Sequence, residues 1–424
     1  MSLGVGIIGA GTVGSGVIEI LTENATSIRD RTGVPVELVH AADTQPAALN
    51  MPGLKDARTS PDAETLIADP NVHIVCELIG GIEPAKTFIL NALKAGKNVV
   101  TANKMLLAYH GPELCKAASD NGAELRYEAA VGGGIPIIKS LREGLAANTI
   151  KSVYGILNGT CNYILTRMTH EGRELGEVLK QAQELGFAET PPDLDVEGHD
   201  TMHKCQIIAS LCCSTEVDPA DIPVEGITGV TRADIGYARE MGYVIKLLAI
   251  ARNVDGEVEA QVRPALVPED HLLASVRNEF NAVYVDSEHT GPTLYYGKGA
   301  GQMPTASAVV ADIIDIGLRG AAPALPPFIY GPRRKVRGED QLEGRYYIRL
   351  TTKDKPGVLG QVCTTLGGHG VSIASCIQHG HHVNDAVHVV LMTHETKQRG
   401  LTAALREIDS LGFIVEPSHR MPVL

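Results

Sequence analysis

The sequence is poor in aromatic side chains and in basic residues, and both shortages exclude something. Among its 424 residues there are no Trp and five Phe, against 45 Gly, so we expect a core of small aliphatic side chains and many tight turns. The formal net charge is −13, whereas a surface that binds nucleic acid needs an excess of Lys and Arg. A nucleic-acid partner is therefore not expected, although backbone amides can still hold a small anionic ligand.

Cysteine pairs and long apolar segments are lacking as well. None of the eight Cys forms a C-x-x-C motif, and several lie in apolar runs, as buried free thiols do in a reducing compartment. No apolar run reaches the roughly 18 residues of a membrane span. LGVGIIGAGTVG at the N-terminus carries no basic region or cleavage signal. We expect a cytoplasmic protein without a membrane partner.

The order of the remaining patterns predicts three domains, because the chain is too long for one typical core. Strand-like and helical segments alternate through residues 1–134, which is typical of α/β proteins with a doubly wound parallel sheet of the Rossmann type. Residues 135–304 mix both patterns and predict an α+β domain, and the helical pattern at 305–320 could return to the first domain. A Pro- and Gly-rich linker at 321–345 precedes a β-α-β-β-α-β order at 346–424, the ferredoxin-like arrangement.

A glycine-rich motif, GAGTVG, follows the first apolar run and begins a helical pattern that extends to about Arg29. In G-x-G-x-x-G the first glycine permits a tight turn, the second lets a pyrophosphate approach, and the third allows close helix–sheet packing. The helix N-terminus then offers N–H groups to the phosphates. This context favours dinucleotide binding over a structural turn. The residues assigned to the cofactor are Gly9, Gly11, Thr12, Val13 and Gly14.

Asp43 ends the second predicted strand, where a carboxylate can bind the adenosine ribose hydroxyls. No Arg or Lys follows it before Lys55. A 2′-phosphate would therefore meet a negative charge without a nearby cation, which favours NAD over NADP.

Two further segments lie at predicted strand ends, where open α/β sheets bind ligands. TANKMLLA places Lys104 just past one strand, and an exposed loop lysine is the alternative. YEAAVGGGIPII places Glu128 and three glycines at the end of another. Such a backbone can turn carbonyls toward a hard cation, but a flexible hinge between domains would use the same glycines.

The stretch GFAETPPDLDVEGHDTMHK, residues 186–204, is predicted as a loop that leads into a helix from about residue 199. On that helix the pairs His199/His203 and Asp200/Lys204 face directions about 100° apart. The histidine pair approximates the H-E-x-x-H motif of zinc peptidases, which needs Glu and a third ligand. An exposed histidine pair is therefore favoured over zinc.

The Asp200/Lys204 pair suits a different chemistry. Hydride transfer between a nicotinamide and a carbonyl or carbinol carbon requires a proton to move at the oxygen. A lysine whose pKa burial has lowered can move that proton, with an aspartate orienting it. A helical salt bridge is the alternative, and the upstream glycine motif favours catalysis.

Together these segments resemble homoserine dehydrogenase. The blocks that carry the resemblance are GAGTVG, TANK, YEAAVGGGIPII, GILNGTCNYIL (155–165), GFAETPPDLDVEGHDTMHK and GKGAGQMPTASAVVAD (297–312). Six blocks in one order across the first 312 residues make a specific match. DKPGVLG (354–360) resembles the ACT regulatory domain that many members carry.

The resemblance implies reduction of L-aspartate 4-semialdehyde to L-homoserine with NAD(P)H, on the route to threonine, isoleucine and methionine. It implies that residues 135–304 bind substrate and form a dimer. ACT pairing could extend the dimer to a homotetramer, with threonine as the expected effector. The implied roles are a proton donor (Lys204, beside Asp200), a lysine near substrate and nicotinamide (Lys104), substrate ligands (Glu189, Asp195), a cofactor contact (Gly301) and a sodium site (Glu128 with the carbonyls of Val131, Gly133 and Ile135).

Two other functions remain open at this stage. Aspartate-semialdehyde dehydrogenase would need a nucleophilic cysteine with a base, and Cys161 in NGTCNY is the loop-like candidate. A non-catalytic sensor of dinucleotide and amino acid could use the same domains.

Overall fold

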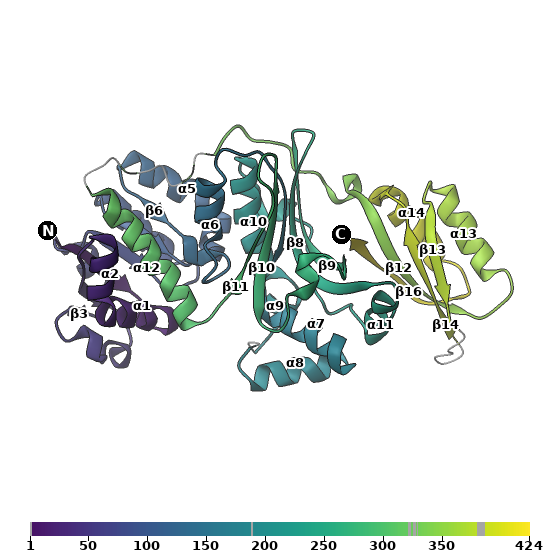
Figure 1. Cartoon of the computed structure of the whole chain (residues 1–424), viewed down its shortest axis with the longest axis horizontal. Helices are drawn as coiled ribbons and strands as arrows, with labels where there is room; N and C mark the ends of the chain where they lie inside the picture. Colours follow the sequence, from purple (N-terminus) through teal and green to yellow (C-terminus); the bar gives the residue numbers. More distant parts are fainter. Residues whose placement is uncertain (1, 188–189, 321–323, 325–327, 329, 380–385) are drawn as a thin grey trace. The chain divides into compact units, whose positions relative to one another are not determined.

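The computed structural model describes residues 2–187, 190–320, 324, 328, 330–379 and 386–424. Figure 1 labels the helices and strands along the chain. The chain divides into two compact units, each assembled from three stretches. The first contains Met1–Leu157, His203–Pro219 and Phe280–Arg334, and the second contains Asn158–Met202, Ala220–Glu279 and Lys335–Leu424.

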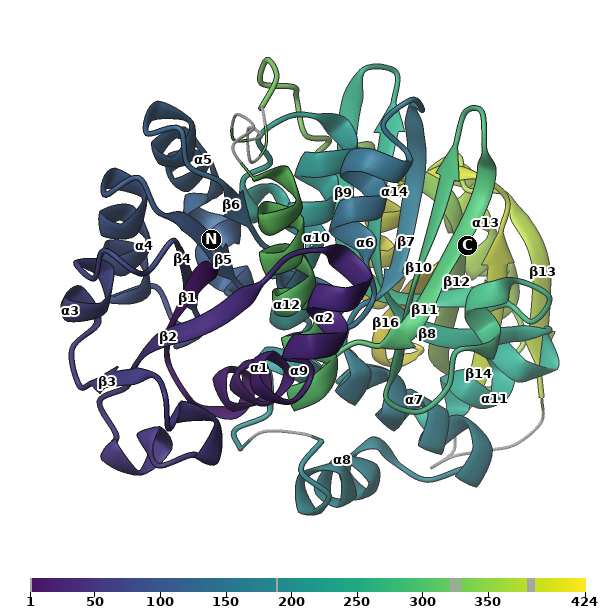
Figure 2. The ribbon, with the colours of Figure 1, turned by 60° about the vertical axis from the view of Figure 1, so that its left-hand side comes forward.

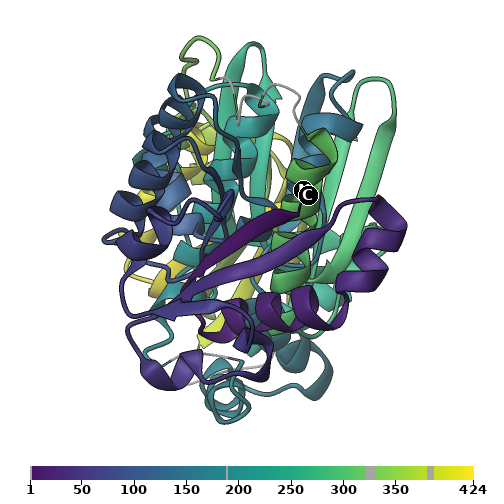
Figure 3. The same cartoon turned by 90° about the vertical axis from the view of Figure 1, so that its left-hand side faces the viewer.

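A parallel sheet forms the centre of the first unit, in the order β3-β2-β1-β4-β5-β6. Its strands are β1 (Leu3–Ile8), β2 (Val36–Ala42), β3 (Arg58–Ser60), β4 (Ile74–Glu77), β5 (Asn98–Thr101) and β6 (Leu125–Arg126). Figure 3 shows the purple β1 and β2 side by side. The order reverses between β1 and β4, and ligands of doubly wound sheets bind at such a switch point. The predicted Rossmann-type sheet is confirmed.

Helices cover this sheet, and one of them comes from far along the chain. They are α1 (Thr12–Glu23), α2 (Ala25–Thr32), α3 (Ala63–Ile67), α4 (Ala85–Lys94), α5 (Lys104–Asp120) and α12 (Gln302–Arg319). Figure 2 shows α12 beside α1, and Gln302 Nε2 donates to Ser15 Oγ at 2.9 Å. Val309 and Ile313 of α12 share a buried core with Val17 of α1.

One continuous helix to Arg29 was predicted, and this was wrong. Asn24 leaves the helical conformation with φ −102° and ψ 8°, and its N–H bonds Ile20 O. Asn favours such caps because its side chain competes for backbone hydrogen bonds. A second helix, α2, therefore starts at Ala25.

The first unit also contains three antiparallel strands and several short elements. β10 (Phe280–Ser287) pairs with β7 (Ile150–Ile156) and with β11 (Gly291–Lys298). The other elements are η1 (Pro46–Leu49), η2 (Pro52–Leu54), η3 (Glu128–Ala130), α6 (Ile137–Lys139) and the π-helical η4 (Ser140–Gly144). The short η5 (Pro219–Asp221) begins at the last residue of the stretch His203–Pro219 and continues into the second unit. Helix α10 (His199–Cys213) has residues in both units.

The second unit begins with helices and a long hairpin. Its helices are α7 (Gly159–Glu171), α8 (Leu175–Glu184), α9 (Asp193–Val196), α11 (Arg232–Glu240) and η6 (Leu272–Ser275). β8 (Tyr243–Val254) and β9 (Glu257–Pro268) pair antiparallel. Asp255 and Gly256 join them with φ of 51° and 84°, the left-handed pair that a tight Asp-Gly hairpin turn requires.

The C-terminal part of this unit has the predicted ferredoxin-like order. It consists of η7 (Glu339–Gln341), β12 (Glu343–Lys353), α13 (Val358–Gly368), β13 (Ile373–Gln378), β14 (Ala386–Thr393), β15 (Thr396–Lys397), α14 (Gln398–Asp409) and β16 (Ile414–Val423). Val423, the last residue of β16, pairs in parallel with Leu266 of β9. In the described part of the chain, no helix has the length and apolar character needed to cross a membrane.

Candidate active site

The glycine motif forms a tight turn between β1 and α1. Gly9 has φ +95°, and a Cβ at Gly14 would overlap the carbonyl oxygen of Gly9. Gly11 is the N-cap of α1, and a Cβ built there would meet nothing within 4 Å. The helix N-terminus therefore faces open space, where a pyrophosphate could receive its N–H groups.

Asp43 is tied to this turn by its own carboxylate. Oδ2 accepts the N–H of Ala10 at 2.8 Å, and Oδ1 accepts the N–H of Gln45 at 2.8 Å. Each oxygen keeps a lone pair for a ribose hydroxyl. Among the ion pairs of the described residues, none involves Asp43.

A buried polar network lies at the ends of β4 and β5, beside the switch point. Thr101 Oγ1 donates to Glu77 Oε2 at 2.7 Å, and Asn103 Oδ1 accepts the N–H of Leu106 at 3.1 Å, capping α5. Lys104 is the first residue of that helix and is half-buried. Lys104 therefore belongs to a helix that Asn103 caps, and the alternative of an exposed loop lysine is wrong.

Glu128 is a buried carboxylate whose oxygens bind a helix end. They accept the N–H groups of Ile138 at 2.8 Å and Lys139 at 2.7 Å. Burial raises the pKa of Glu128 to about 7, although these amides oppose the shift. The N–H of Glu128 in turn donates to Asp312 of α12 at 2.8 Å.

The three glycines after Glu128 are packed against the returning segment. A Cβ at Gly133 would lie 2.6 Å from the carbonyl carbon of Gly299, and the N–H of Gly134 donates to Lys298 O at 3.1 Å. Gly133 is therefore needed for close backbone approach. Gly301 is the N-cap of α12 with φ +109°, so the segment reaches α1 directly after it.

Helix α10 places the predicted proton donor in a buried position. Lys204 is 7% exposed, and its Nζ donates to Leu157 O at 2.7 Å. Asp200, one turn earlier on the same helix, is 9% exposed. A buried ammonium that donates to a backbone carbonyl is held in one orientation, as proton transfer requires.

Asn158, which sequence reasoning missed, connects the two aspartates. Its Nδ2 donates to Asp195 Oδ1 at 2.7 Å and to Asp200 Oδ2 at 3.0 Å. Its Oδ1 accepts the N–H of Cys161 at 2.8 Å and so caps α7. The available signal was an Asn directly before a helical pattern, since Asn is a preferred N-cap residue.

Two other predicted candidates fare differently. Cys161 lies in the first turn of α7 rather than in a loop, is fully buried, and its Sγ donates to Asp195 O at 3.1 Å. A buried thiol that donates to a backbone carbonyl is a poor nucleophile. This argues against aspartate-semialdehyde dehydrogenase, the alternative that needs a nucleophilic cysteine. Glu189 lies outside the described residues.

The histidine pair is not an exposed pair. His199 is exposed, but His203 is only 6% exposed, and its ring meets Tyr109 edge-on with centroids 5.6 Å apart. The expectation was wrong for His203 because the helix face that carries it is buried. Within the described ranges no group of three His, Cys, Asp or Glu side chains is placed to hold a metal.

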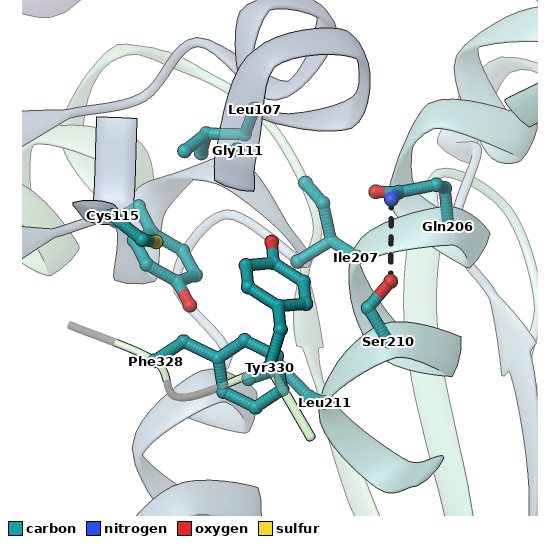
Figure 4. Close-up of a pocket in the computed structure, with 10 residues that line it drawn as sticks. Leu107, Gly111, Cys115, Gln206, Ile207, Ser210, Leu211, Phe328 and Tyr330 are labelled. Carbon is teal, nitrogen blue, oxygen red and sulfur yellow. Dashed lines mark hydrogen bonds between the residues drawn. The ribbon is translucent and has the colours of Figure 1, made fainter. Parts of the chain in front are cut away.

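A small cavity in the first unit is too small for substrate. Its volume is about 10 Å³, room for one water molecule. Figure 4 shows the ring of Tyr330 filling the space between Cys115, Ile207 and Phe328. Burial raises the pKa of the Cys115 thiol to about 12, so this thiol is inert packing.

Comparison with known families assigns nearly the whole chain. Residues 9–128 match the model described as homoserine dehydrogenase, NAD binding domain, residues 136–314 match homoserine dehydrogenase, and residues 346–413 match the ACT domain. The dinucleotide-binding and ACT identities expected from the sequence are thereby confirmed.

Individual relatives agree. A homoserine dehydrogenase from Synechocystis is 42% identical, with 98% of each chain covered, and one from Neisseria gonorrhoeae is 41% identical, covering 97% of this chain and 96% of its own. The structure of a homoserine dehydrogenase from Thiobacillus denitrificans has a TM-score of 0.94 at 39% identity, with 100% of this chain and 98% of its own covered. The chain belongs to the homoserine dehydrogenase family.

Proposed function

We propose that the chain reduces L-aspartate 4-semialdehyde to L-homoserine with a nicotinamide dinucleotide. The observation that carries this proposal is the position of Asn158 between Asp195 and Asp200, directly after the carbonyl that holds Lys204. One short segment, Leu157–Asn158, thus holds a buried ammonium and two carboxylates. The identity of the substrate is inferred from membership of the family.

The proposed mechanism assigns one proton to one atom. When bound, the reduced dinucleotide supplies a hydride to the aldehyde carbon. Lys204 Nζ donates a proton to the carbonyl oxygen as that oxygen becomes negative, which completes the alcohol. The carbonyl of Leu157 orients the ammonium, and Asp200, one turn earlier on the same helix, would stabilise its charge. Asp195 and Glu189 would bind the amino group of the substrate, and Lys104 would lie near substrate and nicotinamide.

NAD is the proposed cofactor in preference to NADP. The glycine turn, from Gly9 to Gly14, and Gly301 would contact the dinucleotide. Asp43 stands where a ribose hydroxyl would bind and has no described cationic partner. A structural relative, the hyperthermophilic archaeal homoserine dehydrogenase, was determined in complex with NADPH. It has a TM-score of 0.64 at 26% identity and covers 75% of this chain and 98% of its own.

A sodium ion is proposed at Glu128 and the carbonyls of Val131, Gly133 and Ile135. The fit is supported by a buried carboxylate that keeps free lone pairs. Two glycines in the turn, Gly132 and Gly133, have φ of 75° and 53°. Oxygen donors of this kind suit a hard cation. The ion would fix the turn against the returning segment.

Feedback inhibition by threonine through the ACT domain is proposed, in a homodimer or homotetramer. A buried contact couples this domain to α11 within the second unit. Arg349 Nε of β12 donates to Asp234 Oδ1 at 2.7 Å, and Tyr347 OH donates to the same oxygen at 2.8 Å. Arg349 holds the pKa of Asp234 below its ordinary value although burial opposes this. A movement of β12 would therefore be transmitted to α11 through these hydrogen bonds.

Initial rates test the function directly. The purified chain is assayed with the semialdehyde and either NADH or NADPH, with and without threonine, and the product is identified by mass. We expect homoserine, a higher kcat/KM with NADH, and threonine inhibition that is lost when residues 346–424 are deleted. Absence of homoserine would refute the activity, and threonine inhibition that survives the deletion would refute the ACT assignment.

A further inference from the structure

A second hollow lies in the second unit, away from the residues assigned to catalysis. Its volume is about 550 Å³, and α7, α11, β8 and the segment around η6 line it. Four cationic or potentially cationic side chains face it, His170, Arg239, Lys246 and Arg277, against one carboxylate, that of Glu269. The hollow therefore carries an excess of positive charge.

Lys246 is the deepest of these groups. It is 2% exposed, and its Nζ donates to Asn162 Oδ1 at 3.0 Å and to the carbonyl oxygen of Val276. Both acceptors are neutral, and the described ion pairs include no carboxylate partner for Lys246. Burial, and then the charge of Arg277, lowers the pKa of Lys246 to about 8. At pH 7 it is still mostly protonated, a buried charge without a counter-ion, which is costly.

The two arginines complete the arrangement at the surface. Arg239 lies in the last turn of α11, Arg277 follows η6 by two residues, and both are exposed. Neither guanidinium has an ion-pair partner in the described part of the chain, whereas most arginines of this protein do, Arg349 and Arg337 among them. Guanidinium groups bind oxyanions through paired N–H donors, and an ammonium adds a compact point charge.

We propose that this hollow binds a small doubly charged oxyanion, with Lys246 as the buried anchor and Arg239 and Arg277 closing over it. Lys246, Arg239 and Arg277 carry three positive charges, and Glu269 carries one negative charge. The remaining two positive charges match the charge of a dianion. The hydroxyl of Thr166 already donates to Asn162 O at 2.6 Å, so it is committed to its own helix. The ligand is therefore selected by its negative charge and not by a hydrogen bond from the hydroxyl of Thr166. Phosphate and small dicarboxylates share this chemistry.

Calorimetric titration of the whole chain tests the proposal. Inorganic phosphate and succinate are titrated separately at constant ionic strength, with NADH saturating so that the glycine turn is occupied. Saturable binding of either dianion at pH 7 is expected, and the tighter one identifies the ligand geometry. Binding is expected to weaken at least tenfold at pH 9.5, where Lys246 has lost its proton while the arginines remain charged.

Substitutions at the surface locate the site without disturbing the core. Arg239→Gln combined with Arg277→Gln should weaken binding at least tenfold. Lys180→Gln, on exposed α8 of the same unit, should leave it unchanged. Absence of saturable binding, or equal affinity in the double variant and the wild type, would overturn the proposal.

Discussion

Two regions of this chain bury a lysine, and they treat it in opposite ways. On α10, Lys204 donates to the carbonyl of Leu157 and follows Asp200 by one helical turn. On β8, Lys246 donates to Asn162 and Val276 and shares the hollow with two exposed arginines and one carboxylate, that of Glu269. Both side chains are almost inaccessible, with 7% and 2% of their surface exposed.

The two proposed roles differ although both lysines are buried. A proton donor needs a fixed orientation and a group that stabilises its charge; Leu157 O orients Lys204, and Asp200 is the group proposed to stabilise it. The hydrogen bonds of Lys246 go to neutral acceptors, Asn162 and Val276. An ammonium there is stabilised by whatever anion enters the hollow, so the same residue type becomes a binding anchor.

The largest effect is expected from removing Lys204, and the removal of Lys246 provides the comparison. Lys204→Met should lower kcat by about 10³-fold, because a positioned general acid contributes about 10²–10⁴. Lys246→Met should lower kcat less than about tenfold. Steady-state rates with the semialdehyde and fluorescence titration of NADH measure both, and NADH affinity should persist in Lys204→Met.

Lys180→Met on exposed α8 serves as the control and should keep the wild-type rate. Undiminished turnover in Lys204→Met would remove the distinction between the two regions, as would equal losses at Lys204 and Lys246.

An intermediate effect is expected at Asn158, because it holds the acids of the α10 region. Asn158→Ala removes the donors to Asp195 and Asp200 and should lower kcat by about 10- to 100-fold, as the loss of supporting hydrogen bonds commonly does. Asn158→Asp should be at least as slow, since it adds a third carboxylate. A structural role alone would change thermal stability without changing kcat, so both are measured.

The smallest effect concerns stability as a function of pH. The folded pKa of Lys246, about 8, lies below its ordinary value of 10.5, so the unfolded chain binds more protons between these values. The contribution of Lys246 to the free energy of unfolding should therefore rise by up to about 3 kcal/mol from pH 8 to pH 10.5.

Urea unfolding of the wild type and of Lys246→Met, in buffer without multivalent anions, measures this contribution as a difference. The difference in unfolding free energy between the two proteins should grow with pH. Its dependence on pH should become weaker when phosphate is added, because a bound dianion raises the pKa of Lys246 in the folded state. A difference that is constant from pH 7 to pH 10 would contradict the unpaired state of Lys246.

Local sequence patterns predicted the structure correctly where the interacting residues are close together in the sequence. The glycine motif predicted its turn because Gly9 and Gly14 meet within a few residues. The ferredoxin-like order followed from alternating apolar runs. The same reasoning failed at Asn24, where a single residue ended the predicted helix before Arg29.

Nonlocal contacts account for what could not be predicted. Asn158 meets Asp195 and Asp200, which lie 37 and 42 residues further along. His203 was taken for an exposed residue because nothing in its neighbourhood predicts the ring of Tyr109, almost a hundred positions earlier. Lys246 was not predicted as a site residue, since a single lysine in an apolar strand belongs to no recognisable motif.

The sequence by itself determined the fold class and the family, and its helical spacing suggested Asp200 and Lys204 as an acid–lysine pair, because helical spacing and ordered motifs are local properties. Only the tertiary structure decided which groups those side chains meet. It set Asn158 against two aspartates, packed α12 onto α1, and gave Lys246 two neutral acceptors, Asn162 and Val276. Burial and partner choice depend on distant segments, and these fix the electrostatics on which function depends.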